Sequence, residues 1–252
     1  VRATTTTCFR PASALMGLMK TLPIIARRYQ VRRRLGRGAW GEVFLVEDLL
    51  EPGRLVALKT RRIDPHGAGD TRASLAAEFR ALTRVRHPNL ARVYDLGLTR
   101  EPGAGLTQIY FTRQFVDGDD LVAVLRDAPE TSAFEAAAVL CHALATIHDH
   151  GLIHGDLSAA NVLGAVGGPA SELRIIDFGL AVTMSGESSQ ISGLRGTLHY
   201  VAPEVLSGAH LSARTDLYAL GALLHHGFVG EPPFQGSPAA VIQQHLDVPP
   251  PP

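Results

Sequence analysis

The sequence predicts an α+β protein with two lobes, a β-rich N-terminal lobe with one helix and a mainly helical C-terminal lobe. Residues 29–63 consist of short apolar or alternating runs broken by glycine and Pro-Gly, as in antiparallel hairpins. After "DGDDL" (117–121) the apolar residues recur at helical spacing. The 252 residues, 46% of them hydrophobic, are enough for two lobes with a buried core.

The first lobe is expected to hold strands within 29–63, then one helix, then two more strands. The helix covers 71–86, where Leu75, Phe79, Leu82 and Val85 are three or four residues apart. The segment "HPN" (87–89) ends it, because proline disfavours helical geometry in the residue before it. Strand-like runs follow over 90–98 and 107–116.

The second lobe begins after a hinge near 115–118 and contains most of the helices. One of them opens with a capping box formed by Ser132 and Glu135. The helices are expected over 119–128, 132–151, 215–230 and 237–246. We therefore predict a disordered extension over 1–28, an N-lobe over 29–116 and a C-lobe over 117–252. Because "PPPP" closes the chain, the C-lobe is expected to lack its last helices and to be joined to further C-terminal domains.

Composition argues against several classes of partner. Lys and Arg together number 24, as do Asp and Glu, so no net charge favours nucleic acid or an anionic membrane. No run reaches the roughly 18 apolar residues of a membrane-spanning helix. The two cysteines, Cys8 and Cys141, lack metal-site spacing, which favours a reduced, cytoplasmic setting.

Two features of the first lobe suggest phosphate binding. In "GRGAWGEV" (36–43) three glycines lie between strands, where backbone N–H groups can approach an anion, although a glycine-rich hairpin would look the same. Lys59 ends the strand "VALK" in a chain whose only other lysine is Lys20. Since arginine serves elsewhere as the general cation, Lys59 suits a phosphate and a carboxylate better than a snorkelling role. Glu78, on the apolar face of its helix, could supply that carboxylate.

The second lobe supplies oxygen ligands. In "IHGDLSAANVL" (153–163) Asp156 could accept a proton from a hydroxyl nucleophile, and Asn161 could bind a metal through its amide oxygen. Asp177 follows an apolar strand in "IIDFGL". Such hard oxygen ligands suit Mg²⁺ that bridges phosphates better than they suit zinc. His154 is expected to pack in the loop core.

Taken together and in this order, the motifs resemble those of eukaryotic-type serine/threonine protein kinases. They are "GRGAWGEV", "VALK", the helix Glu78, "HGDLSAAN", "DFG", "GTLHYVAPE" and "TDLYALG", spread over about 29–248. The resemblance implies a bilobal kinase-like fold and ATP-dependent transfer of a phosphoryl group to protein hydroxyls. The arginine-rich composition favours a bacterial source.

The resemblance also implies roles for individual residues. Gly36, Arg37, Gly38 and Gly41 would cover the ATP phosphates, and Lys59, anchored by Glu78, would contact two of them. Asp156 would act on the substrate hydroxyl, while Asn161 and Asp177 hold Mg²⁺, and Asp216 would brace the catalytic loop. The base would lie between Val43, Ala57 and Leu163, bonded to the backbone of Gln114 to Val116, with Arg113 near the gatekeeper position.

The sequence departs from the family pattern at three places. Gly155 stands where the family usually has an arginine that reads activation-loop phosphorylation, so we expect no need for that switch. Ser158 replaces the usual lysine, and Ala160 is not the arginine of tyrosine kinases. About 48 residues follow the "APE" motif, so Glu204 is expected to lack its arginine partner. A catalytically weak pseudokinase or ATP-sensing scaffold and a small-molecule phosphotransferase therefore stay open as alternatives.

Overall fold

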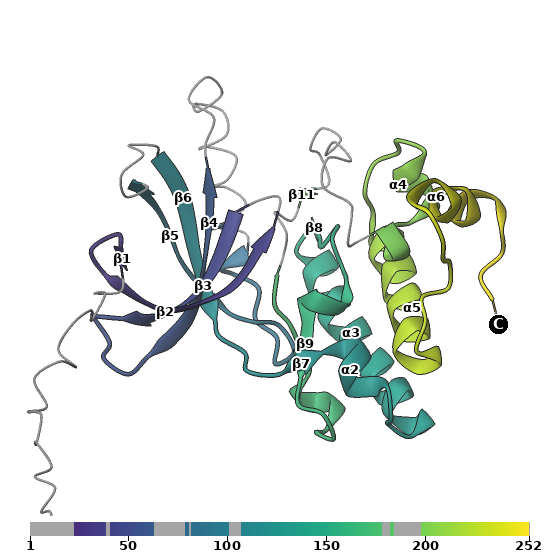
Figure 1. The fold of residues 1–252 in the computed structure, drawn as a ribbon, viewed down its shortest axis with the longest axis horizontal. Helices are drawn as coiled ribbons and strands as arrows, with labels where there is room; N and C mark the ends of the chain where they lie inside the picture. The colour runs from purple at the N-terminus through teal and green to yellow at the C-terminus, as the bar shows by residue number, and fades with distance from the viewer. Residues whose placement is uncertain are drawn as a thin grey trace, which may run out of the picture.

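A computed structural model describes residues 23–38, 41–62, 79–80, 82–100, 107–177, 182–183 and 198–251. Figure 1 shows a curled sheet in one lobe and a group of helices in the other, which confirms the predicted bilobal α+β class. Within the described ranges, no helix combines the length and apolar character needed to cross a membrane. The predicted helix over 71–86 lies mostly outside the described residues, and only residues 79, 80 and 82 are described as helical.

The N-lobe is one six-stranded antiparallel sheet with the strand order β1-β2-β3-β4-β6-β5. Its strands are β1 (Ile24–Ile25), β2 (Tyr29–Gly38), β3 (Gly41–Asp48), β4 (Leu55–Arg62), β5 (Val93–Arg100) and β6 (Thr107–Gln114). Alternation along β4 gives the sheet two different faces. Val56 and Leu58 join the buried cluster with Tyr29, whereas Ala57 and Lys59 face the other way.

The sheet begins earlier than predicted, within the segment 1–28 that we expected to be a disordered extension. Ile24 pairs with Gln30, and Ile25 pairs with Tyr29. Arg28 then donates two hydrogen bonds to Asp48, of 2.7 and 2.6 Å, whose side chain is 2% exposed. These bonds hold the pKa of Asp48 below its usual value. A bidentate pair to a buried carboxylate fixes this corner.

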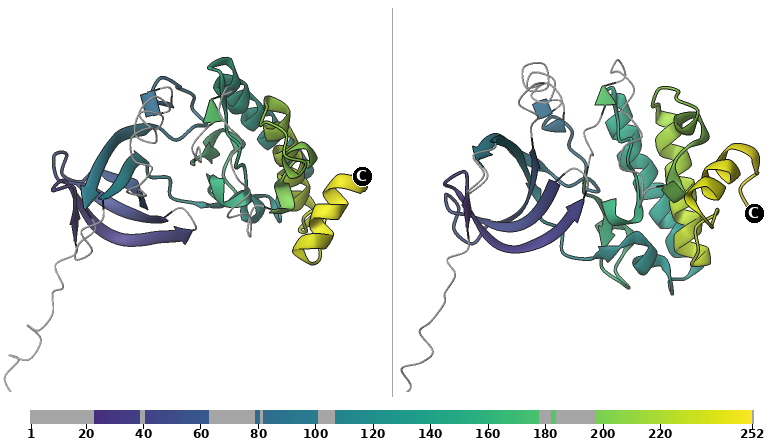
Figure 2. Two further views of the ribbon diagram at one scale, coloured as in Figure 1. Left: turned by 90° about the horizontal axis from the view of Figure 1, so that it is seen from above. Right: turned by 45° about the horizontal axis from the view of Figure 1, so that its top comes forward.

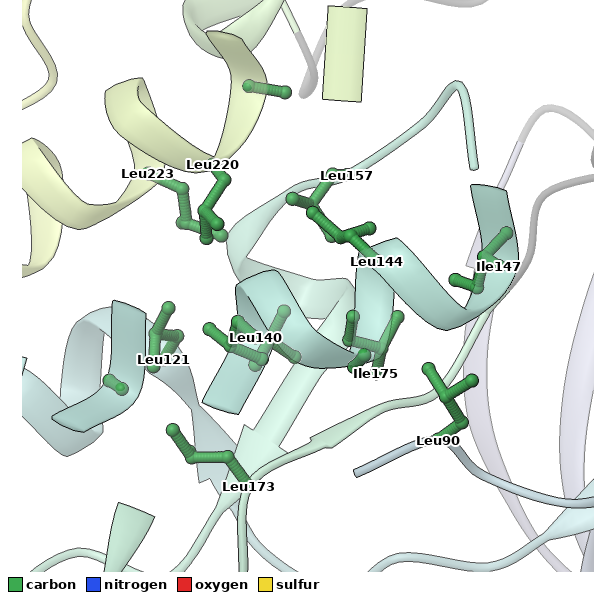
Figure 3. Packing of buried hydrophobic residues seen from close by; sticks show 14 of the residues in the cluster. Leu90, Leu121, Leu140, Leu144, Ile147, Leu157, Leu173, Ile175, Leu220 and Leu223 are labelled. Atoms are coloured by element: carbon green, nitrogen blue, oxygen red, sulfur yellow. The ribbon is translucent and has the colours of Figure 1, made fainter. Parts of the chain in front are cut away.

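The C-lobe packs helices around α3 (Figure 3). Leu140, Leu144 and Ile147 of α3 are fully buried and lie among leucines and isoleucines from α2, β10 and α5. The helices are α2 (Leu121–Leu125), α3 (Glu130–Asp149), α4 (Pro203–Leu206), α5 (Ala213–Val229) and α6 (Pro238–Asp247). The short strands are β7 (Asp119–Asp120), β8 (Leu152–Ile153), β9 (Val162–Gly164), β10 (Arg174–Ile175) and β11 (Val182–Thr183).

The capping box predicted at Ser132 and Glu135 is wrong. Helix α3 begins two residues earlier, at Glu130, after Pro129, which provides no side-chain cap. Ser132 instead donates its backbone N–H to the Pro129 carbonyl at 2.9 Å, as a first-turn residue does. A true capping box occurs at α5, where Ser212 and Thr215 exchange side-chain and backbone bonds.

The two lobes are joined by the hinge and by a second connection, the "HPN" segment. Asn89 is buried, and its side-chain amide donates to the carbonyls of Ser171 and Leu173 at 3.0 and 2.8 Å. Backbone bonds link Ala91 and Asn89 to Ile175, each at 2.8 Å. The further views in Figure 2 show the sheet and the helical lobe on opposite sides of these connections, with α6 farthest from the sheet.

Candidate active site

The face of the sheet that turns toward the C-lobe carries the predicted nucleotide-contacting residues. Lys59 and Ala57 share this face, and ladder pairing places Val43 opposite Lys59 and Arg113 opposite Ala57. Directly paired residues project on the same side of an antiparallel sheet. Val43, Ala57, Lys59 and Arg113 therefore form one surface.

Lys59 reaches across to the C-lobe. Its ammonium donates a hydrogen bond of 2.7 Å to Oδ2 of Asp177, and the two side chains are 18% and 14% exposed. Lysine therefore meets the "DFG" aspartate in this structure. The expected partner Glu78 lies outside the described residues, and so do Phe178 and Gly179.

Three contacts hold the catalytic loop in place. Leu157 is 2% exposed and packs beside Leu144 in the C-lobe core (Figure 3). Asp216, on α5 and 1% exposed, accepts backbone N–H bonds from His154 at 2.9 Å and Gly155 at 2.8 Å. It also bonds His148 Nε2 at 2.8 Å. The sequence-based expectation that Asp216 braces this loop is confirmed.

Within the loop, Asp156 and Asn161 are tied to each other. The Asn161 side-chain amide donates to the Asp156 carbonyl at 2.7 Å, and the Asp156 N–H donates to His154 Nδ1 at 3.3 Å. His154 is fully buried, in agreement with its predicted packing role. Burial lowers its pKa despite the opposing charge of Asp216.

The β9–β10 hairpin brings Asn161 next to Asp177. Ile175 pairs with Val162, and Ile176 donates its N–H to the Asn161 carbonyl at 2.9 Å. Asp177 therefore follows directly after a residue bonded to Asn161. The backbone of this hairpin therefore places the residues Asn161 and Asp177 of two motifs at the same end of the β9–β10 pair.

The donor set fits a divalent cation. Oδ1 of Asp177 is buried and accepts no hydrogen bond from any described group, although its other oxygen serves Lys59. The amide nitrogen of Asn161 faces a carbonyl, which assigns Oδ1 of Asn161 as the oxygen left for a ligand. A buried carboxylate oxygen without a donor is costly, and a hard cation such as Mg²⁺ would satisfy it.

The glycine-rich loop is a β2–β3 hairpin in which Gly36 pairs with Val43, Arg37 with Glu42, and Gly38 with Gly41. Ala39 and Trp40, at its tip, lie outside the described residues. A Cβ built on Gly36 would meet no atom within 4 Å. Packing against the described residues therefore does not require glycine here, and this open space is compatible with a ligand beneath the loop.

The remaining base-contact candidates surround the hinge. Gln114 ends β6, and Val116 lies in the hinge. Leu163 lies on β9 and pairs with Asp120 of β7, near the start of the C-lobe. All three are partly buried. The structure thus distributes them across both lobes and the segment between them, as a nucleotide cleft requires.

Two contacts of the C-lobe were not predicted. Glu204, expected to lack its arginine partner, accepts a hydrogen bond of 3.0 Å from the buried hydroxyl of Thr215. Asn89 was interpreted only as part of a helix terminator, yet it ties the lobes together. Asn89 lies in a turn closed by the bond of 3.1 Å from the Leu90 N–H to the His87 carbonyl, and its sequence context carries no signal for this second role. The serines Ser185, Ser188, Ser189 and Ser192 lie outside the described residues.

Gly155 adopts a left-handed backbone with φ +72°, and a Cβ there would lie 2.9 Å from a Leu211 methyl. Gly151 has a similar φ of +70° but open space around it. We expect Gly155→Ala to lower the free energy of unfolding by about 1–3 kcal/mol, and Gly151→Ala by about 1 kcal/mol through backbone strain alone. Urea unfolding of both variants measures the difference. Equal losses would contradict the contribution of the Leu211 contact.

Stability is expected to fall in mild acid. Burial lowers the pKa of His154 and of His245 below the ordinary value of 6.5. As the pH falls below about 6.5, the unfolded chain binds protons that these folded histidines do not, so the free energy of unfolding decreases, by up to about 1.4 kcal/mol per pH unit for each group. Melting temperatures between pH 7.5 and 5.5 should drop, and His245→Gln should reduce the slope. His210→Gln, at an exposed site, is the matched control. An unchanged slope in His245→Gln would count against this assignment.

Comparison with known proteins agrees with this geometry. The protein kinase domain family matches residues 29–248. Serine/threonine-protein kinase PknF of Mycobacterium tuberculosis is 37% identical over 236 residues, covering 88% of this chain and 47% of PknF. The DNA damage-responsive serine/threonine-protein kinase RqkA of Deinococcus radiodurans is 39% identical over 237 residues, covering 90% of this chain and 34% of RqkA.

A third relative is the probable serine/threonine-protein kinase PknB of Corynebacterium glutamicum, 34% identical over 91% of this chain and 36% of its own length. The chain thus spans between about a third and a half of the length of these relatives. All three are bacterial proteins named as serine/threonine kinases. On the family match, the bilobal fold and the cross-lobe pair of Lys59 with Asp177, this chain belongs to the protein kinase domain family.

Proposed function

We propose that this chain is a serine/threonine protein kinase that transfers the γ-phosphoryl group of ATP, with Mg²⁺, to hydroxyls of protein substrates in bacterial signalling. The observation that carries the proposal is the 2.7 Å contact between Lys59 and Asp177 across the lobes, beside a buried Asp177 oxygen that lacks a donor. A cation and a metal-ready carboxylate facing one cleft suit a polyphosphate ligand.

Different residues of the cleft would bind Mg²⁺, bind the phosphates and act on the substrate hydroxyl. Asn161 and Asp177 would hold Mg²⁺, which when bound neutralises charge on the phosphates. Lys59 would release Asp177 and bind phosphate oxygens instead, and Glu78 would then be the carboxylate that holds Lys59 in place. Asp156 would orient the substrate hydroxyl and accept its proton. Leu157 and Asp216 would keep Asp156 in position by fixing the loop that carries it.

The nucleotide would be enclosed by the residues around the hinge and by the glycine-rich loop. Backbone groups of Gln114 to Val116 would bond the base between Val43, Ala57 and Leu163. The loop residues Gly36, Arg37, Gly38 and Gly41 would cover the phosphates, for which the open space at Gly36 leaves room. The same proposal places the chain in the cytoplasm, without nucleic-acid partners, as the kinase part of a longer protein.

The test is transfer of label from ATP to a generic basic protein in the presence of Mg²⁺, beside Asp156→Ala. Transfer by the parent protein and none by the variant supports the proposal. Thermal stabilisation by ATP without transfer would instead favour a pseudokinase or ATP-sensing scaffold, for which Ser158 in place of lysine is the motivating residue. Transfer only to sugars or aminoglycosides would favour a small-molecule phosphotransferase.

A further inference from the structure

Arg113 is a cation buried in the wall of the proposed nucleotide cleft. It is 7% exposed and lies next to the last residue of β6, directly opposite Ala57. Its neighbour Thr112 turns inward, where its hydroxyl accepts a bond from the Asp95 N–H at 3.1 Å. Because side chains alternate along a strand, Arg113 faces the same side as Lys59.

The charge of Arg113 has little compensation within the described part of the chain. No carboxylate in the described residues forms an ion pair with Arg113. Asp177 forms its ion pair with Lys59 instead. Burial lowers the pKa of Arg113, and Asp177 is the charge that opposes this effect. A buried guanidinium is costly unless its donors are satisfied.

Within the described ranges, the guanidinium of Arg113 makes one hydrogen bond, which shows where its donors lie. Nη1 donates to the Gln114 carbonyl at 3.3 Å, a long bond, and a guanidinium has five N–H donors. Gln114 is the first residue of the backbone segment that we propose binds the nucleotide base. The donors of Arg113 are therefore at the inner end of the base site, and they occupy the carbonyl that a base amino group would need.

The two common purines respond differently to such donors. Adenine presents an amino group at position 6, which is itself a donor and competes with Arg113 for the Gln114 carbonyl. Guanine presents two acceptors side by side, O6 and N7, which arginine can bind with two parallel bonds. A guanidinium at this place would therefore find acceptors on guanine and repel the amino group of adenine.

We propose that Arg113 shifts the base preference of the cleft toward 6-oxopurine nucleotides, so that GTP serves as a phosphoryl donor alongside ATP. This inference rests on the proposed function, because it assigns the base of the nucleotide to the Gln114 end of the same cleft. Arg113 acts as a specificity-determining residue and takes no part in the transfer itself.

The experiment compares kcat/KM for GTP and for ATP, each with Mg²⁺, in the parent protein and in Arg113→Met. We expect the ratio of GTP to ATP to fall by about tenfold or more in Arg113→Met, since a bidentate base contact discriminates at this level. Arg113→Lys keeps the charge without the planar fork and should give an intermediate ratio. Arg214→Met removes an exposed arginine of α5 and should leave the ratio unchanged. An identical ratio in the parent and Arg113→Met overturns the inference.

Binding without turnover separates this inference from the kinase proposal. GDP is expected to raise the melting temperature of the parent protein at least as much as ADP does, and Arg113→Met should reverse that order. If neither triphosphate supports transfer but this reversal is seen, the kinase proposal fails and the role of Arg113 stands. If transfer occurs and the order of GDP and ADP does not depend on Arg113, the kinase proposal stands and the role of Arg113 is overturned.

Discussion

Asp216→Ala is expected to lower the free energy of unfolding by about 3–5 kcal/mol and to reduce kcat by at least about 100-fold. The carboxylate of Asp216 accepts the N–H groups of His154 and Gly155 and the ring nitrogen of His148. Alanine removes the acceptor from one buried donor, the His154 N–H, and from two partly buried donors, at about 1–3 kcal/mol for each buried group. The loop carrying Asp156 then loses its anchor, and a misplacement of about 1 Å is enough for the loss in rate.

Urea unfolding and steady-state kinetics measure the two effects separately. Asp216→Asn keeps one acceptor oxygen and should fall between alanine and the parent in stability. Asp247→Ala, at an exposed position near the end of α6, is the matched control and should change neither quantity by much. If Asp216→Ala unfolds at the same urea concentration as the parent, the bracing role assigned to this residue is wrong.

Local patterns were sufficient to predict the fold class and most of the elements. The apolar run "VALK" predicted a strand, and the structure shows β4 with a core face that carries Val56 and Leu58 and a cleft face that carries Ala57 and Lys59. Element ends were less accurate, because several residues can cap one helix. Ser132 and Glu135 have the right spacing for a capping box, yet α3 begins two residues earlier, at Glu130, directly after Pro129.

The candidate site could be predicted as a set of residues, while its contacts could not. The motifs identified Lys59, Asp156, Asn161 and Asp177, because their chemistry depends on residue type and local spacing. The bond between Lys59 and Asp177 joins positions 118 residues apart, so it depends on how the two lobes pack together and not on local sequence. The burial of Arg113 could not be predicted for the same reason, because the mixed polar and apolar sequence of β6 does not show which residues cover it.

Asp177→Asn is expected to reduce kcat by about 10³-fold while changing the free energy of unfolding by no more than about 1 kcal/mol. The amide can still accept a hydrogen bond from Lys59, and both side chains of this pair retain some exposure, which limits the loss of stability. What the amide lacks is the negative charge needed to hold Mg²⁺ together with Asn161. Oδ1, which is buried without a donor from the described residues, is the atom most affected.

Melting temperatures with ADP, with and without Mg²⁺, test this assignment independently of turnover. In the parent protein Mg²⁺ should increase the stabilisation by ADP, because a metal that bridges the phosphates and Asp177 binds only the folded state. In Asp177→Asn this increase should disappear while some stabilisation by ADP alone remains. Asp247→Asn makes the same chemical change at an exposed site and should respond to Mg²⁺ as the parent does. A full Mg²⁺ response in Asp177→Asn would show that the metal is held elsewhere. The buried Oδ1 of Asp177 would then not be a metal ligand.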